Sequence, residues 1–168
     1  MQFKRVHIIG GAGSGKTTLA RQYAAATDAA HYELDDLYYL EIAARTKRAK
    51  TDRDEQLAKA IAGQQWVIDG IFWQPWVQPS LERADKIIIL AVPERTRHLR
   101  VVTRHFRYLP RAPVRQWRYF FPTLVELLRH NRAYDGGPLQ ETQALIAPYA
   151  EKVSICRSNA AAHQALGL

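Results

Sequence analysis

The residues with the clearest chemistry lie near the N-terminus, in the segment Gly10-Gly11-Ala12-Gly13-Ser14-Gly15-Lys16-Thr17. This segment matches the pattern G-x-x-x-x-G-K-[ST] at every fixed position. Glycines let the backbone curl around an anion with its N–H groups pointing inward. A helix that begins near Lys16 would aim its positive end at the same anion. The sequence therefore predicts a loop that holds the phosphates of a nucleotide.

The side chains at the end of this loop have separate predicted roles. We expect Lys16 to neutralise the β- and γ-phosphate oxygens and the Thr17 hydroxyl to coordinate Mg²⁺. ATP is favoured over GTP because the guanine-reading motif Asn-Lys-x-Asp is absent: neither Asn131 nor Asn159 precedes a lysine. The residues of this segment predicted to contact the nucleotide are Gly11, Ala12, Gly13, Ser14, Gly15, Lys16, Thr17 and Thr18.

Two carboxylates follow predicted strands. Asp69 ends the apolar run that starts at Trp66, and Asp35 follows the weaker run that starts at His31. Both are expected at the carboxyl edge of the sheet, where ligands bind in open α/β folds. We predict that they join Thr17 in the Mg²⁺ site. Asp35 has two alternative roles: a helix N-cap, or a general base for a hydroxyl acceptor, whereas a phosphate acceptor needs no base.

Positive charge is concentrated in one stretch of the chain. Residues 93–119 hold eight arginines and a single acidic residue, while the whole chain carries a net charge of +8. Arg100 and Arg104 are four residues apart and share a helix face, where they could stabilise the charge on a transferred phosphoryl group. The alternatives are a solvated basic face or a nucleic-acid surface, since Tyr108 and Trp117 interleave with the arginines.

Strand and helix patterns alternate along the chain, which indicates an α/β protein with a parallel sheet. Leu57 and Ile61 are expected to share the apolar face of one helix, and Leu99, Val102 and Phe106 that of another. The predicted strands are Phe3–Ile9, His31–Leu34, Trp66–Ile68, Lys86–Val92 and Lys152–Cys156. The predicted helices are Lys16–Thr27, Asp54–Ala62, Pro93–Arg107, residues 114–133 with a break at Pro122, Pro138–Ala150 and Asn159–Leu166.

Length and composition narrow the class of protein. A chain of 168 residues that is 47% hydrophobic is expected to form one domain, residues 1–168, with a core that needs no disulfide. The lone cysteine, Cys156, excludes a disulfide framework and a cysteine-based zinc site. The apolar run Val6–Ile9 is too short for a secretory signal or a membrane span. We therefore expect a cytoplasmic protein with no membrane partner.

Taken as an ordered set, these motifs resemble adenylate kinase and its relatives among the P-loop small-molecule kinases. The resemblance is closest to the FlaR-related group of DNA topology modulation proteins, and it spans roughly residues 3–135. Beyond the phosphate loop, the segments that carry it are Glu33-Leu34-Asp35-Asp36-Leu37-Tyr38, Trp66-Val67-Ile68-Asp69-Gly70 and Leu81-Glu82-Arg83-Ala84-Asp85.

The resemblance implies a three-layer α/β/α fold with a five-stranded parallel sheet in the order 2-3-1-4-5. It implies an arginine-rich helical lid at about residues 105–118, served by Arg100 and Arg104, with Arg100 also contacting the nucleotide. It places Ser158, in the loop after the last strand, beside the adenine. The implied function is transfer of the γ-phosphate of Mg-ATP to a small-molecule acceptor. The alternative is an ATP-dependent regulator that binds nucleic acid through the arginine segment.

The sequence departs from adenylate kinase at the acceptor side. Adenylate kinases follow the Asp-Gly pair with Phe-Pro-Arg, whose arginine grips the AMP phosphate, but here Asp69-Gly70 continues as Ile71-Phe72-Trp73-Gln74. The missing arginine lowers the expectation of AMP as acceptor. The aromatic residues expected either to line the acceptor pocket or to pack as half-buried side chains are Tyr38, Tyr39, Trp73 and Trp76.

Overall fold

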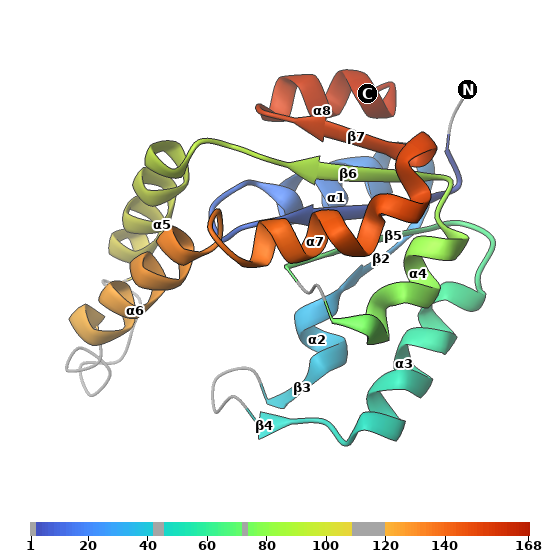
Figure 1. The fold of residues 1–168 in the computed structure, drawn as a ribbon, viewed down its shortest axis with the longest axis horizontal. Coiled ribbons are helices and arrows are strands. Elements are labelled where there is room, and N and C mark those ends of the chain that lie inside the picture. The colour runs from blue at the N-terminus through green and yellow to red at the C-terminus, as the bar shows by residue number, and fades with distance from the viewer. Residues whose placement is uncertain (1–2, 42–45, 72–73, 109–119) are drawn as a thin grey trace.

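A computed structural model of the protein describes residues 3–41, 46–71, 74–108 and 120–168. Its main sheet has five parallel strands in the order β2-β5-β1-β6-β7 (Figure 1). Counted among these five alone, the order along the chain is 2-3-1-4-5, so the predicted fold class is confirmed. The strands are β1 (Arg5–Gly10), β2 (Ala30–Glu33), β5 (Trp66–Gly70), β6 (Lys86–Leu90) and β7 (Val153–Cys156).

Helices cover both faces of the sheet, as the continuous apolar runs of the central strands require. One face packs on α1 (Lys16–Thr27) and α8 (Asn159–Leu166), where Ile8, Ile88 and Leu19 are fully buried. The other face packs on four helices, with Ile68 and Ile87 at its centre. These four helices are α2 (Leu34–Tyr38), α3 (Lys50–Ala62), α4 (Gln78–Arg83) and α7 (Pro138–Ile146).

Several short elements were not predicted from the sequence. They are α2, α4, the 3-10 helices η1 (Pro75–Val77) and η4 (Ala147–Lys152), and an antiparallel pair formed by β3 (Tyr39–Glu41) and β4 (Thr46–Lys47). Helix α3 begins at Lys50, earlier than predicted, while α7 ends at Ile146 and gives way to η4.

Two further helices, α5 (Glu94–Tyr108) and α6 (Phe120–Ala133), stand beside each other at one end of the sheet (Figure 1). Pro122 lies in the first turn of α6, where a proline is tolerated, so the predicted break does not occur within that helix. Most of the predicted lid, and the predicted helical residues 114–119, lie outside the described residues.

The predicted apolar face of α5 is wrong. Leu99 and Phe106 are 68% and 48% exposed, whereas Val101 and the charged Arg97 are each 1% exposed. The face of α5 that packs against the rest of the protein therefore contains Arg97 and Val101, which are four residues apart. The expected face of α3 is confirmed, since Leu57 and Ile61 are both buried. No helix within the described residues is both long and apolar enough to cross a bilayer.

A fully buried histidine, His7, lies in the middle of β1. The Ser80 hydroxyl donates to the Val77 carbonyl over 2.6 Å, so it accepts from His7 Nδ1 at 3.0 Å. His7 Nε2 has no partner among the described residues. Burial lowers the pKa of His7 to about 4, although the charge of Asp69 acts in the opposite direction. The folded protein therefore holds this imidazole neutral.

The neutral, buried His7 leads us to predict how the free energy of unfolding depends on pH. Since the folded pKa is below the unfolded value of about 6.5, the unfolded chain binds more protons between these two values. The free energy of unfolding should therefore fall by about 2–3 kcal/mol as pH drops from 7 to 4.5. Urea denaturation at several pH values measures it. His7→Gln should lose most of this slope, and equal slopes in both proteins would contradict the assignment.

Candidate active site

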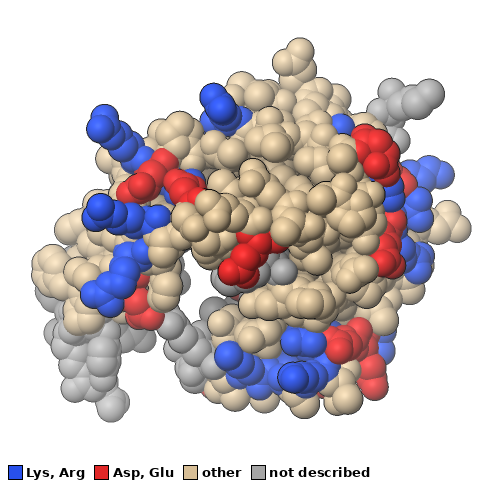
Figure 2. All heavy atoms as spheres, viewed as in Figure 1, with Lys and Arg blue, Asp and Glu red and all other residues tan. Residues whose placement is uncertain are grey.

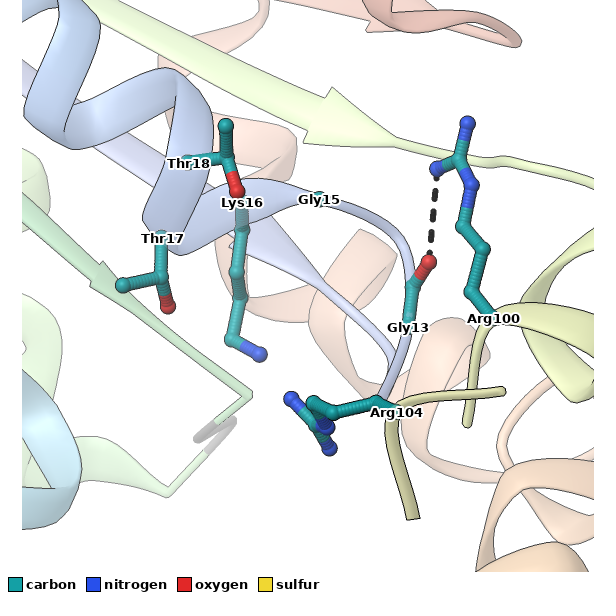
Figure 3. Close-up of a pocket in the computed structure, with 7 residues that line it drawn as sticks. All are labelled: Gly13, Gly15, Lys16, Thr17, Thr18, Arg100 and Arg104. Atoms are coloured by element: carbon teal, nitrogen blue, oxygen red, sulfur yellow. Dashed lines mark hydrogen bonds between the residues drawn. The ribbon is translucent and has the colours of Figure 1, made fainter. Parts of the chain in front are cut away.

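The phosphate-binding segment lies at the carboxyl end of β1, between the sheet and α5 (Figure 3). It borders an open pocket with a volume of about 190 Å³. Lys16, Thr17 and Arg104 point into the same space, and they come from two elements far apart in the sequence. The residues that line the pocket are Gly13, Gly15, Lys16, Thr17, Thr18, Arg100 and Arg104.

The loop adopts a backbone that depends on its glycines. Gly13 and Gly15 have φ angles of 77° and 95°, in the left-handed region where other residues are strained. Ser14 N donates to the Gly11 carbonyl at 3.1 Å, which closes the turn before α1. The first N–H groups of α1 have no acceptor within their own helix, so they are available to an anion at its N-terminus. The loop therefore fits a phosphate chain.

Thr17 and Asp69, two of the predicted metal ligands, are in direct contact. The Thr17 hydroxyl donates to Asp69 Oδ2 over 2.7 Å, and Asp69 Oδ1 lies 2.7 Å from His31 Nε2. Asp69 is 1% exposed, so this carboxylate has a fixed orientation. Both groups offer the oxygen atoms that Mg²⁺ prefers, and Mg²⁺ usually needs only one or two protein carboxylates beside the phosphates. The pair therefore fits the ion.

Asp35, the third predicted ligand, lies in the first turn of α2. Glu33, and not Asp35, occupies the N-cap position of this helix. Burial raises the pKa of Asp35, the positive charge of Lys16 lowers it, and the negative charge of Asp69 raises it again. Glu33, the last residue of β2, pairs in register with Asp69 of β5, and Asp35 follows two residues later. Asp35 therefore lies at the same edge of the sheet as Asp69 and the end of β1, where the phosphate loop begins.

Arg100 connects three parts of the site. Its Nη1 donates to the Ser14 carbonyl at 2.9 Å, to the Gly13 carbonyl at 3.3 Å and to Asn159 Oδ1 at 2.9 Å. Figure 3 marks the bond to Gly13. Asn159 also packs against Gly15, where a Cβ atom would stand 2.5 Å from the amide nitrogen of its side chain. Arg100 thus ties α5 to the phosphate loop and to the start of α8.

Ser158, predicted to contact the nucleotide, has a local role in the structure. Its hydroxyl accepts from the backbone N–H of Ala161 at 3.1 Å, which caps the N-terminus of α8. The residue beside it, Asn159, is the one that touches the loop. Nucleotide contact by Ser158 stays a prediction.

The arginine segment does not form one basic surface on its described part. Arg97 is buried and paired with Asp135, while Arg100 and Arg104 line the pocket. In Figure 2, basic and acidic side chains alternate over α5 and α6 on the visible face. The nucleic-acid alternative is therefore not favoured. The segment's other arginines are Arg95 and Arg107, which are exposed, and Arg111, Arg115 and Arg118, which lie outside the described residues.

The aromatic residues expected near the acceptor are grouped beside α2. The rings of Tyr38 and Trp76 are 5.9 Å apart between centroids, and the guanidinium of Arg53 lies 4.7 Å from the Trp76 ring. Tyr38, Tyr39 and Trp76 are half-buried and pack against the core below α2 and α3. Trp73 lies outside the described residues. Figure 2 shows a hollow between this region and the α5–α6 pair.

Three features of the site escaped sequence reasoning. His31 was read only as a strand residue, and its contact with Asp69 depends on the parallel pairing of β2 with β5. Tyr134 packs against Gly11, and Arg97 is buried beneath the loop. The sequence did hold one signal for Arg97, because it shares a helix face with the apolar Val101.

The comparisons with known proteins agree with this geometry at the level of the fold. No protein-family model and no curated protein matches the chain. A solved shikimate kinase from Acinetobacter baumannii, in complex with shikimate, is 17% identical with a TM-score of 0.54, and the match covers 98% of this chain and 89% of that one. The chain has the fold of a P-loop small-molecule kinase.

A gluconokinase from Sinorhizobium meliloti is also similar, at 19% identity and a TM-score of 0.48, over 90% of this chain and 96% of that one.

The described residues contain no group of three or more His, Cys, Asp or Glu side chains arranged to hold a metal. The finer resemblance to the FlaR-related group stays a prediction.

Proposed function

We propose that the protein is a kinase that transfers the γ-phosphate of ATP to a hydroxyl group of a small molecule. The observation that carries the proposal is the position of Asp35. Asp35 lies in the first turn of α2, two residues after Glu33, which pairs in register with Asp69 at the carboxyl end of β5. A hydroxyl acceptor must lose a proton, whereas a phosphate acceptor has none to lose, so a carboxylate at this point favours the hydroxyl.

The fold supports the same class of acceptor. The shikimate kinase that the chain resembles was solved in complex with shikimate, a small molecule. In this protein the hollow beside the α5–α6 pair would receive the acceptor. Tyr38 and Trp76, whose rings lie 5.9 Å apart beside α2, are the side chains that we propose to contact it. The departure from the Phe-Pro-Arg motif at Ile71 argues against AMP.

The proposed reaction uses the side chains in fixed roles. Lys16 and the loop N–H groups bind the phosphate chain, and Thr17 with Asp69 would hold Mg²⁺, which when bound neutralises charge on the β- and γ-phosphates. Asp35 takes the proton of the acceptor hydroxyl while the hydroxyl oxygen forms a bond to the γ-phosphorus. The bond from that phosphorus to the bridging oxygen breaks, and ADP leaves with the electron pair. Arg104 stabilises the charge on the transferred group.

A screen for ATP-dependent phosphorylation tests the proposal directly. The purified protein is incubated with Mg-ATP and panels of small alcohols, sugars, hydroxy acids and nucleoside monophosphates, and ADP release is measured. We expect turnover with a hydroxyl compound. Turnover with nucleoside monophosphates alone would contradict the choice of acceptor. Tight Mg-ATP binding without turnover on any panel would contradict the transfer itself.

Arg104 gives a sharper test of the proposed chemistry. Arg104→Ala should lower kcat about 10-fold or more, because a preorganised cation is lost from the developing charge. The KM for ATP should change less, since Lys16 and the loop remain. Arg107→Ala is a matched control, because Arg107 is an exposed arginine one turn further along α5. Equal kcat values in the two variants would show that Arg104 does not stabilise the charge on the transferred phosphoryl group.

A further inference from the structure

Arg97, which has no role in the proposed chemistry, makes more side-chain hydrogen bonds than any other described residue of α5. It is 1% exposed, and each of its three guanidinium nitrogens donates hydrogen bonds. Its Nη1 and Nη2 grip Asp135 Oδ1 and Oδ2 at 2.9 and 3.0 Å. Its other acceptors are the Val92 carbonyl at 2.8 Å, Asn131 Oδ1 at 2.8 Å and the Asn131 carbonyl at 3.1 Å.

This bonding fixes one geometry. Guanidinium has five N–H donors in a rigid plane and stays charged, so all five bonds form together only when the partners stand in place. The partners lie at the end of β6 and around the end of α6, at Asn131 and Asp135. Arg97 therefore locks the first turn of α5 to two other parts of the protein.

The same cluster touches the phosphate loop at two glycines. Tyr134, fully buried and 5.3 Å below the Arg97 guanidinium, lies against Gly11, where a Cβ atom would be 2.9 Å from its ring. The backbone oxygen of Arg97 would be 2.5 Å from a Cβ atom at Gly13. The loop thus packs against this cluster at Gly11 and Gly13.

We propose that Arg97 is a positioning residue, which holds α5 and the phosphate loop in register through Asn131, Tyr134 and Asp135. The expected effect of Arg97 on the rate of phosphoryl transfer rests on the proposed function. Arg100 and Arg104 follow Arg97 by three and seven residues on the same helix face. Arg104 therefore lies about 10 Å along the axis, where a small tilt of α5 moves its guanidinium appreciably. A misplacement of about 1 Å can cost about 100-fold in rate.

Arg97→Lys tests the proposal, because it keeps the positive charge beside Asp135 and loses the planar guanidinium that donates to both carboxylate oxygens. Measured well below its unfolding temperature, the variant should bind Mg-ADP about 10-fold more weakly and hydrolyse ATP, without any acceptor, about 10–100-fold more slowly. Asp135→Asn keeps the shape of the partner and should show a smaller loss of both. Arg95→Lys, at an exposed arginine on α5, is the matched control and should behave as the wild type.

The readouts separate positioning from stability. If Arg97→Lys and Asp135→Asn lower only the unfolding temperature, with Mg-ADP affinity and hydrolysis within twofold of the wild type, the proposal is overturned. Both readouts need no acceptor. A wild-type protein that binds Mg-ADP but phosphorylates no acceptor would therefore contradict the proposed function. The effect of Arg97→Lys on Mg-ADP affinity could still be measured.

Discussion

Lys16→Ala is expected to abolish phosphoryl transfer while leaving the fold intact. The Lys16 amine is the cation of the loop itself, and it points into the space shared by Thr17 and Arg104 (Figure 3). Without it, the charge that gathers on the β- and γ-phosphates in the transition state loses its nearest counter-charge. We expect a loss of about 10²–10³-fold or more in kcat, by analogy with removal of one preorganised donor from a reacting oxyanion.

The measurement is ADP release from ATP, together with circular dichroism of the variant to establish that it is folded. Lys59→Ala, which removes an exposed lysine from α3, is the control for a general loss of positive charge. Normal turnover in Lys16→Ala would show that the nucleotide does not bind in this loop. The remaining assignments of the site would then lose their basis.

The second large effect is expected at Asp35. Asp35→Asn keeps the size of the side chain but cannot accept a proton, so phosphorylation of a hydroxyl acceptor should fall by about 10²–10⁴-fold, the range typical of general base catalysis. The neighbouring Asp36→Asn removes an equal charge from an exposed position and should have little effect. Rates of acceptor phosphorylation in the two variants give the comparison.

A binding measurement on the same variant distinguishes the two roles left open for this carboxylate. If Asp35 acts as the base, Asp35→Asn should bind Mg-ADP with nearly the wild-type affinity. If Asp35 instead holds the metal, the affinity for Mg-ADP should fall while the affinity for ADP without Mg²⁺ stays unchanged. Full activity in Asp35→Asn would exclude both roles.

The parts of the fold that were predictable from the sequence are those with strong local signals. The bounds of α1 agree with the prediction, because a glycine loop before Lys16 and an extended apolar strand leave little freedom. The five strands were each located to within a few residues, and the signal was strongest for β1, β5 and β6, which are buried runs of mainly apolar residues. The short α2, α4 and the β3–β4 pair have no comparable pattern, because their neighbours determine their conformation.

Local patterns held only a weak signal for the burial of a charged residue, the helix face that Arg97 shares with Val101. Hydropathy places Arg97 on a surface and Leu99 in a core, and the structure has them the other way round. A guanidinium can be buried only where acceptors surround it, and its acceptors Asn131 and Asp135 are more than thirty residues further along the chain. The contact of His31 with Asp69 has the same origin, since only the pairing of β2 with β5 brings them together.

The chain divides the work of the pocket between separate stretches. The loop after β1, helix α5 and the start of α8 form the side that faces the phosphates, while α2, β3, β4 and α3 form one uninterrupted excursion between β2 and β5 (Figure 1). Under the proposed function this stretch supplies Asp35 and Tyr38, while Trp76 comes from η1 after β5. We therefore expect replacement of this stretch beyond Asp35 to change which acceptor is phosphorylated and to leave Mg-ADP binding at the phosphate loop unchanged.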